Sequence, residues 1–286
     1  MTRIQATGVG FAAVISWALL ALFTVGSAPV PPLLLNAMSF AVAGIIGVVW
    51  THATGGWGKL RTVSWRVYVF GTFGLFGYHA LYFSALRLAP PAEAGLIAYL
   101  WPLLIVLMSG LLPGERLRAG HFIGALMGFA GAALIIGGGL GFATGALPGY
   151  LLALGCAVTW SGYSVLSRRL GHAPTETVAV FCLATAILSA ALHLALEETI
   201  WPAEALGWVS VLGLGLGPVG LAFYVWDIGV KRGDIQLLGV VSYAAPLLST
   251  LILVLAGVAA PSWTLAMSAM LITGGAALAA RASFNG

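Results

Sequence analysis

The chain has 286 residues, of which 60% are hydrophobic and only 7% are charged, and its formal net charge is +4. A soluble domain carries about 25% charged residues, so water cannot be the main solvent for this surface. The apolar runs lack the alternating polarity of a transmembrane β-barrel, and they reach the length of about 20 residues that crosses a bilayer as helix. We therefore predict an all-α integral membrane protein.

Ten segments are apolar and long enough to cross a membrane. In chain order they are residues 7–26, 32–51, 66–87, 91–112, 118–137, 148–168, 175–195, 206–230, 234–256 and 262–281. The connections between these transmembrane helices are short. A soluble catalytic head, a nucleotide-binding domain and a large ectodomain are therefore excluded.

The basic residues orient the ten spans. Every one of the 12 Lys and Arg residues except Arg87 falls in a segment on the side of the N-terminus. Because Lys and Arg in short loops mark the cytoplasmic side, we predict that both termini are cytoplasmic. The positive net charge then reports topology, and we expect the lipid bilayer, and no nucleic acid, as the partner of this surface.

The first and third spans carry aromatic rings near the middle of the membrane. Trp17 lies in the first span, and Tyr78, His79 and Tyr82 fit within one arc of about 100° on the third. Trp and Tyr normally gather at the two water interfaces, so their depth here favours a cavity wall. Such rings stack on a flat or cationic substrate. The alternative is that they fill space between helices.

His79 is a titratable group inside a span, where polar groups are costly and often functional. We expect it to line a cavity, where it hydrogen-bonds substrate or titrates during a working cycle. The alternative is a neutral, buried imidazole bonded to a neighbouring residue. Asp227, in the eighth span, lies four residues before Lys231, and we expect these two to form a local ion pair.

The fourth span contains Tyr99, Trp101 and Pro102. Proline lacks a backbone N–H and clashes with the preceding turn, so Pro102 is predicted to be a hinge or helix break. Tyr99 and Trp101 are about 200° apart on an ideal helix. Both therefore face one cavity only if Pro102 distorts the helix.

The fifth span places four glycines, Gly120, Gly124, Gly128 and Gly131, along one face. Small residues at this spacing let helix backbones approach closely in lipid. We expect the partner helix to belong to the same chain, which favours a monomer or a weak homodimer.

The second half repeats these features. The predicted substrate-binding residues from both halves are Trp17, Tyr78, His79, Tyr82, Tyr99, Trp101, Trp160, Tyr163 and Tyr243. The predicted hinges or helix breaks are Pro102, Pro246, Gly217 and Pro218. Simple packing kinks are the alternative interpretation of the prolines.

A short phrase occurs once in each half. Residues 98–104 read Ala-Tyr-Leu-Trp-Pro-Leu-Leu, and residues 242–248 read Ser-Tyr-Ala-Ala-Pro-Leu-Leu. Five spans in each half mean that the second half enters the membrane from the opposite side. We predict two inverted five-helix repeats, residues 1–140 and 141–286, within one membrane domain. Inverted repeats with interrupted helices are typical of secondary transporters.

The motifs of common enzymes are missing from the sequence. We find no Walker loop, no HExxH and no GxSxG, and no His, Cys and Asp cluster at ligand spacing. We therefore expect no enzyme activity, no cofactor and no bound metal. Cys156 and Cys182 are predicted to be packing residues.

Residues 92–137 resemble the drug/metabolite transporter superfamily, in its EamA-type ten-helix class. The similarity lies in the Ala-rich start of the fourth span, the midspan Pro102, the phrase Leu-Leu-Pro-Gly-Glu-Arg-Leu at 111–117, and the Gly-rich fifth span. Glu115 matches the acidic residue that commonly follows the fourth span in that class. Ala259-Ala260-Pro261 stands at the equivalent place of the second half, so a role for Glu115 is structural and limited to the first half.

Within that superfamily, the midspan aromatics make the chain similar to bacterial aromatic amino acid exporters, some of which also remove flat cationic compounds such as paraquat. The resemblance implies a carrier of the bacterial inner membrane whose two repeats alternate around a central cavity. We predict export of amino acids or related metabolites, with aromatic amino acids as the leading small-molecule substrate. Export of small hydrophilic amino acids or of cationic or aromatic drugs is the alternative. A lipid flippase or membrane-embedded enzyme is disfavoured.

Overall fold

The computed structural model describes residues 1–136, 144–255 and 260–284. The predicted boundary between the two halves, at residues 140 and 141, lies outside these ranges, as does Ala259. Every regular element within the described ranges is helical. The helices are α1 (Arg3–Trp17), α2 (Leu20–Gly26), α3 (Pro32–Ala53), α4 (Trp57–Arg61), α5 (Trp65–Leu88), α6 (Pro91–Ala98), α7 (Trp101–Ser109), α8 (Ala119–Ile136), η1 (Thr144–Ala146), α9 (Leu147–Arg169), α10 (Thr177–Leu196), α11 (Ala205–Leu216), η2 (Gly217–Leu221), α12 (Ala222–Arg232), α13 (Ile235–Val241), α14 (Ala244–Leu255) and α15 (Trp263–Phe284).

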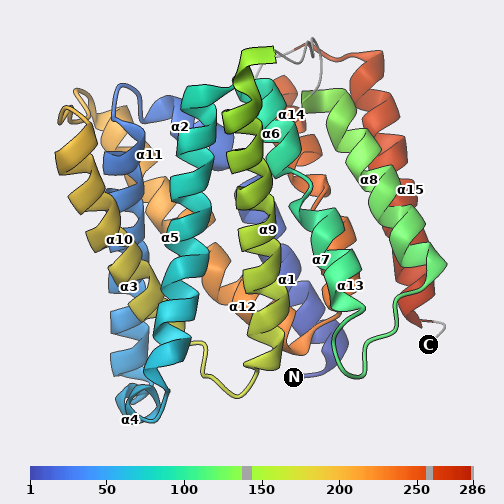
Figure 1. Ribbon diagram of the computed structural model, residues 1–286, viewed down its shortest axis with the longest axis horizontal. Helices are drawn as coiled ribbons and strands as arrows, with labels where there is room; N and C mark the ends of the chain where they lie inside the picture. The colour runs from blue at the N-terminus through green and yellow to red at the C-terminus, as the bar shows by residue number, and fades with distance from the viewer. Residues whose placement is uncertain (137–143, 256–259, 285–286) are drawn as a thin grey trace.

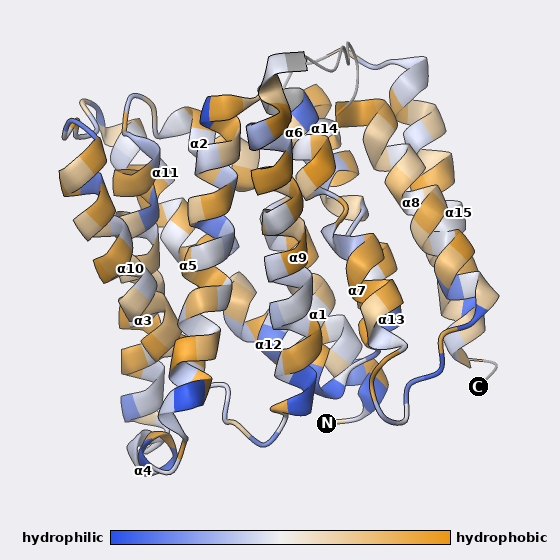
Figure 2. Cartoon of the chain, in the orientation of Figure 1, coloured by the Kyte–Doolittle hydropathy of each residue, from blue (hydrophilic) through white to orange (hydrophobic). Residues whose placement is uncertain are grey.

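These helices confirm the prediction of a ten-helix membrane protein. Nine segments of the described chain are long and apolar enough to cross a membrane, and the tenth is the shorter apolar stretch Glu93–Ser109. Hydrophobic residues occupy the middle parts of the helices (Figure 2). Hydrophilic residues gather at the ends of the bundle, where a membrane would meet water.

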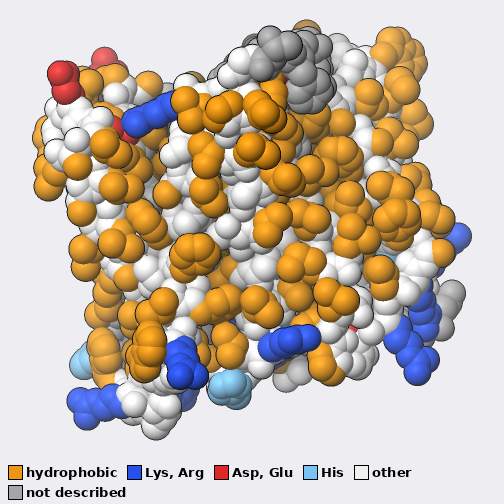
Figure 3. Space-filling view, viewed as in Figure 1, with side chains coloured by type: hydrophobic (Ala, Val, Ile, Leu, Met, Phe, Trp, Pro, Cys, Tyr) orange, Lys and Arg blue, Asp and Glu red, His pale blue; other side chains and the backbone are white. Residues whose placement is uncertain are grey.

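Both chain termini lie at one end of the bundle (Figure 1). We call this end the terminal face, and the other end the opposite face. Most Lys and Arg side chains visible in Figure 3 lie at the terminal face. The helix α1 runs away from this face and α9, which begins the second half, runs toward it (Figure 1).

Four spans are interrupted near the middle of the bundle. A two-residue turn separates α1 from α2 at Ala18 and Leu19, and similar turns separate α6 from α7 and α13 from α14. The eighth span contains η2, a π-helical turn that starts at Gly217. Pro102 is the second residue of α7, and Pro246 is the third of α14. Proline suits this position because the first N–H groups of a helix have no partner within it.

Close contacts between backbones hold the bundle together. The predicted glycine face of α8 packs against α15 of the same chain. A Cβ atom on Gly124 would lie only 2.5 Å from the carbonyl oxygen of Gly275, so any larger side chain would force these helices apart. α1 crosses α12 equally closely, since a Cβ on Gly10 would lie 2.9 Å from the Cα of Gly229. This crossing brings the end of α1 next to η2.

Candidate functional site

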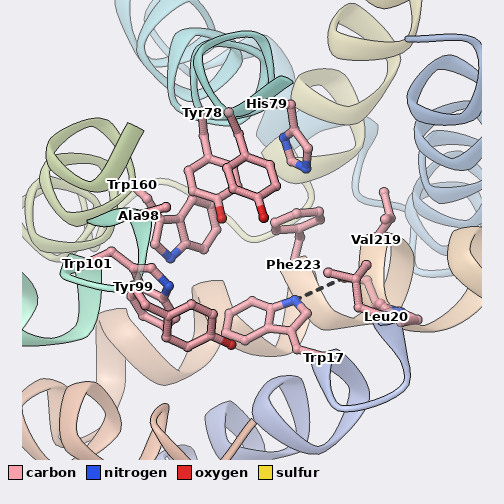
Figure 4. A pocket seen from close by; sticks show the side chains of 12 residues that line it. Trp17, Leu20, Tyr78, His79, Ala98, Tyr99, Trp101, Trp160, Val219 and Phe223 are labelled. Atoms are coloured by element: carbon pink, nitrogen blue, oxygen red, sulfur yellow. Dashed lines mark hydrogen bonds between the residues drawn. The ribbon is translucent and has the colours of Figure 1, made fainter. Parts of the chain in front are cut away.

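A cavity of about 140 Å³ lies where the interrupted spans meet, between helices of both halves of the chain (Figure 4). It is lined by Trp17, Leu20, Tyr78, His79, Tyr82, Ala98, Tyr99, Trp101, Trp160, Pro218, Val219 and Phe223. The structure thus brings together seven of the nine residues that the sequence analysis predicted for substrate binding. None of the twelve lining residues is Lys, Arg, Asp or Glu.

The backbone interruptions place these side chains around one space. The turn between α1 and α2, the turn between α6 and α7, and η2 each contribute a part of the wall. The continuous helices α5 and α9 supply the rest, together with the start of α12. The interrupted spans therefore supply a large part of the cavity wall.

The break in the fourth span solves the problem that Tyr99 and Trp101 pose on an ideal helix. The turn at Tyr99 and Leu100 breaks the helix just before Trp101. Both Tyr99 and Trp101 therefore line the cavity, with their ring centroids 6.4 Å apart. The Ser161 hydroxyl of α9 donates a hydrogen bond to the Trp101 carbonyl oxygen at 2.9 Å. This bond fixes the start of α7 against the second half of the chain.

Four tryptophans, Trp17, Trp101, Trp160 and Trp226, form a cluster at the cavity. All six distances between their ring centroids lie between 5.1 and 6.3 Å. Four of these pairs meet edge to face and one is stacked, and both arrangements are favoured for aromatic rings at this spacing. Trp226 is buried behind the cavity wall, and its indole N–H donates to the Ser164 hydroxyl at 3.1 Å.

Trp226 and Phe223 were missed by the sequence analysis. Phe223 lines the cavity and stacks on Phe40 at a centroid distance of 5.4 Å. Phe223 and Trp226 are three residues apart on α12, so they lie on one face of that helix. This spacing, directly after the Gly- and Pro-rich η2, is the signal that could have found them.

Two predicted residues, Tyr163 and Tyr243, do not line the cavity. Tyr163 is buried behind Trp160, at a centroid distance of 5.3 Å, and stacks on Phe70. Tyr243 is fully buried, and its hydroxyl oxygen accepts a hydrogen bond from the backbone N–H of Leu103 at 3.1 Å. The position of a residue along its span gives its depth in the membrane but not the direction of its side chain. The sequence could therefore not separate these two tyrosines from the rings that line the cavity.

The break in the first span is joined to η2 by one hydrogen bond. The indole N–H of Trp17 donates to the carbonyl oxygen of Pro218 at 3.0 Å, drawn as the dashed line in Figure 4. A π-helical turn disturbs the regular backbone pairing of a helix, and Trp17 satisfies one of the carbonyl groups in that turn. The bond also holds the Trp17 ring at the cavity wall.

His79 lies on the wall beside Tyr78. Its Nδ1 is 2.7 Å from the backbone carbonyl oxygen of Leu75, one turn earlier on α5. Its ring meets the rings of Phe40 and Tyr78 edge to face, each at a centroid distance of 5.0 Å. The surroundings of His79 are therefore aromatic, with one backbone carbonyl as its hydrogen-bond partner.

A set of ion pairs, which we call the terminal ion cluster, lies at the terminal face, where α1 starts and α9 ends. It consists of Arg3, Glu115, Arg168 and Asp234. Arg3 is 3.1 Å from Glu115 and 3.2 Å from Asp234, and Arg168 forms a second ion pair with Glu115. Arg168 also donates to two backbone carbonyls at the end of α12, those of Val230 and Gly233. Glu115 thus joins the first half of the chain to the second.

The predicted pair of Asp227 and Lys231 is present on α12, with a nitrogen–oxygen distance of 2.8 Å. Both side chains are buried, and the ammonium also donates to the Ala173 carbonyl oxygen at 3.0 Å. At the opposite face, Arg87 pairs with Glu197 at 3.0 Å. The Glu197 carboxylate also accepts the backbone N–H of Leu33 at the start of α3, so this pair holds neighbouring helices together outside the cavity.

Within residues 1–136, 144–255 and 260–284, no three His, Cys, Asp or Glu side chains come together in a way that could hold a metal ion. The chemistry that the cavity offers is non-covalent. It consists of ring faces, Tyr and Trp hydrogen-bonding groups, one imidazole and an opening between two halves of a helical bundle. Such a site can bind a small molecule that carries an aromatic ring.

Comparison with known proteins identifies close relatives. The chain matches the EamA-like transporter family twice, over residues 6–137 and 147–281. It is 57% identical over 282 residues to the aromatic amino acid exporter YddG of Ancylobacter novellus, covering 98% of both chains. It is 26% identical to the protein of the same name from Salmonella typhimurium, covering 87% of this chain and 88% of that one. A crystal structure that is 58% identical in sequence superimposes with a TM-score of 0.94 and covers 97% of both chains.

Proposed function

The chain belongs to the EamA-like transporter family, and from its cavity we propose that it is a carrier that exports aromatic amino acids by alternating access. The observation that supports this most is the cavity itself, which seven aromatic rings and one imidazole surround at the meeting point of both halves. The 57% identical relative is named an aromatic amino acid exporter, which supports the same substrate class. A carrier acts by binding and releasing its substrate, so this function is not that of an enzyme.

The cavity suits the ring of an aromatic amino acid in size and chemistry. A cavity of about 150 Å³ in a protein core is large enough to hold one benzene molecule, and this cavity measures about 140 Å³. Aromatic pairs gain about 0.5–1.5 kcal/mol beyond their buried area, so a ring gains more here than an aliphatic side chain does. Eight of the twelve lining residues have aromatic or imidazole rings and four are aliphatic, which argues against a path for lipid tails.

The proposed cycle needs the cavity to open toward one side at a time. We propose that buried Trp226, the buried ion pair of Asp227 and Lys231, and the terminal ion cluster close the path from the cavity to the terminal face. We take the terminal face to be cytoplasmic because Lys and Arg gather there, in the inner membrane of a bacterium. The structure then corresponds to a state that is closed to the cytoplasm.

The proposed halves are residues 1–140 and 141–286, arranged as inverted repeats. The family match occurs once in each, and the breaks in the fourth and ninth spans correspond in position. We propose that Pro102, Pro246, Gly217 and Pro218 mark the places where the helices bend during the cycle. We also propose a monomer or a weak homodimer, because the glycine face of α8 is already covered by α15.

Efflux from reconstituted vesicles tests the function. Vesicles that contain the protein and are loaded with radiolabelled tryptophan or phenylalanine should release either one faster than protein-free vesicles. Replacing Trp160 by Phe should slow release about tenfold, since it removes part of one wall. Trp263→Phe is the matched control, because Trp263 is exposed at the start of α15 and its replacement should change nothing. Release equal to that of protein-free vesicles would contradict the proposed function.

A further inference from the structure

His79 is held in one tautomer. Its Nδ1 lies 2.7 Å from the Leu75 carbonyl oxygen, and a carbonyl oxygen can only accept a hydrogen bond, so Nδ1 carries the proton. In a neutral imidazole the other nitrogen, Nε2, then keeps a free lone pair. None of the described carboxylates forms an ion pair with His79, and an unpaired charge in such a place is costly. The neutral ring is therefore the form that this site holds.

The free nitrogen of His79 is an acceptor at the cavity wall. Figure 4 shows the imidazole pointing from α5 toward the space beside Tyr78 and Phe223. Among the described residues, none donates a hydrogen bond to Nε2. A lone pair in this position is matched by a donor on the ligand, and charged N–H groups form the strongest such bonds. The wall therefore offers a place for an ammonium group.

The aromatic rings around that place also favour a positive charge. The faces of Trp, Tyr and Phe rings carry partial negative charge and attract cations within about 6 Å. The rings of Phe40, Tyr78 and Phe223 lie at centroid distances of 5.0, 5.0 and 6.3 Å from the His79 ring, and those of Tyr78 and Phe223 line the cavity with it. A carboxylate receives no such attraction from a ring face.

No cationic side chain is available to a carboxylate in this cavity. Lys and Arg do not occur among the described lining residues. Lys231, further along α12, is engaged by Asp227 and the Ala173 carbonyl. Arg168, further along α9, is engaged by Glu115 and two backbone carbonyls. A carboxylate here meets only neutral donors and loses water.

We propose that the cavity also binds and carries aromatic monoamines, which have an aromatic ring and an ammonium group but no carboxylate. The ring occupies the aromatic cavity and the ammonium group donates a hydrogen bond to Nε2 of His79. The inference rests on the proposed transport function and extends its cargo to a second chemical class. The carboxylate of an amino acid is then tolerated by the site, and the ammonium group is required.

Three indole compounds separate the two polar groups. Tryptophan has both, tryptamine lacks the carboxylate, and indole-3-propionate lacks the ammonium group. Equilibrium binding of each radiolabelled compound is measured on the purified full-length protein in detergent. Tryptamine is expected to bind within tenfold of tryptophan, and indole-3-propionate more than tenfold more weakly. Exchange of external radiolabelled tryptamine for internal unlabelled tryptamine, and separately of tryptophan for tryptophan, in proteoliposomes and corrected for protein-free vesicles, then measures the transport of each compound by itself.

The outcomes distinguish this inference from the proposed function. If tryptophan binds and tryptamine binds more than tenfold more weakly, the inference is overturned and the proposed function stands. If tryptamine binds and exchanges while tryptophan does neither, the inference stands and the proposed function fails. If neither binds, both fail. Binding of tryptamine without exchange overturns its role as cargo, and equally tight binding of indole-3-propionate overturns the requirement for ammonium.

A substitution of His79 tests the contact with Nε2. His79→Phe keeps a ring and removes the acceptor, so binding of tryptophan and tryptamine should weaken about tenfold or more, while that of indole-3-propionate stays the same. His52→Phe is the matched control, since His52 is exposed near the end of α3. Equal weakening of all three compounds would show that His79 only supports packing, and would contradict the proposed contact.

Discussion

The two proline-containing breaks share a sequence phrase but face different surroundings. In the first, Tyr99 and Trp101 line the cavity. In the second, Tyr243 is fully buried and Ala245 stands in the place that corresponds to Trp101. The difference teaches that the local sequence sets where a helix breaks, while the neighbouring helices decide whether the break forms a binding surface or part of the packed interior.

The buried break supports the open one. The first N–H groups of a helix lack partners within that helix. At the start of α7, the Tyr243 hydroxyl accepts the N–H of Leu103. The Tyr243 ring is itself held by α8, where a Cβ atom on Gly128 would lie only 2.4 Å from it. The second break thus acts as a fixed support for the wall that the first break presents to the cavity.

The largest effect should come from forcing the second break to resemble the first. Ala245→Trp places an indole where only 3% of the alanine is exposed, and overpacking of this size should cost more than about 3 kcal/mol of stability. Thermal unfolding in detergent, together with the yield of monodisperse protein, measures the loss. Leu255→Trp, at an exposed position of α14, is the control. A stable, well-packed Ala245→Trp protein would show that the second break has room for a ring.

Removing the hydroxyl that joins the two breaks should have the next largest effect on stability. Tyr243→Phe leaves the Leu103 N–H without its partner, which should cost about 1–3 kcal/mol. Tyr99→Phe removes the equivalent hydroxyl of the first break and should change stability by less than about 0.5 kcal/mol. Denaturation curves of both variants under the same conditions test the pair. The reverse ranking would contradict the assignment of a supporting role to Tyr243.

Substitutions that preserve the fold should affect transport only at the first break. Trp101→Phe replaces an indole that contacts Trp17 and Trp160 in the cavity wall with a smaller ring. We expect the rate of tryptophan efflux to fall about tenfold, which is equivalent to about 1.4 kcal/mol. Ala245→Ser makes a small change at the second break and should leave the rate unchanged. Efflux per amount of folded protein is the measurement. Equal losses in the two variants would mean that both breaks contact the substrate.

The smallest effect is expected far from both breaks, in an ion pair at the terminal face. Burial raises the pKa of Glu176. The Lys59 ammonium, 2.7 Å away, lowers that pKa by more than burial raises it, so the pKa of Glu176 is below the ordinary carboxyl value. The stabilisation is therefore present above the ordinary carboxyl pKa and is lost as the pH falls through the lowered one. Because the Lys59 side chain is 60% exposed, we expect the pair to be worth about 0–1 kcal/mol, as for ion pairs at a protein surface.

Comparison with Lys59→Met isolates this contribution. The stability difference between the unchanged protein and the variant should shrink as the pH is lowered from neutral through the ordinary carboxyl pKa of 4.5 and then through the lowered pKa of Glu176 in thermal unfolding experiments. Tryptophan efflux at neutral pH should be the same in both proteins. A constant difference across the pH range would show that Glu176 and Lys59 do not interact in solution.

Much of the fold could be predicted because membrane insertion depends on local properties of the chain. The ten spans follow from apolar length, and the breaks of the fourth and ninth spans follow from Pro102 and Pro246. The break at Ala18 and Leu19 could not be predicted, since neither residue is a proline or a glycine. Its position depends on the contact of Trp17 with Pro218, which lies 201 residues away in the chain.

The candidate site was predictable in depth but not in direction. Counting residues along a span places a side chain at a height in the membrane, so Tyr163 and Tyr243 were grouped with the rings that line the cavity. The direction in which a ring points depends on how the helices pack and where they break. For the same reason Phe223 and Trp226 were overlooked, although they lie at the same depth as the predicted rings.

The sequence by itself determined that this chain is a ten-helix membrane protein, with basic residues on one side and breaks where two prolines begin new helices. These properties follow from the transfer free energy of individual residues and from the missing N–H of proline, and neither needs a neighbour. The tertiary structure alone decided which rings share the cavity, which break supports the other, and which carboxylates join Arg3 and Arg168 at the terminal face. Those outcomes depend on close contacts between helices that are distant in sequence, such as Gly10 with Gly229 and Gly124 with Gly275.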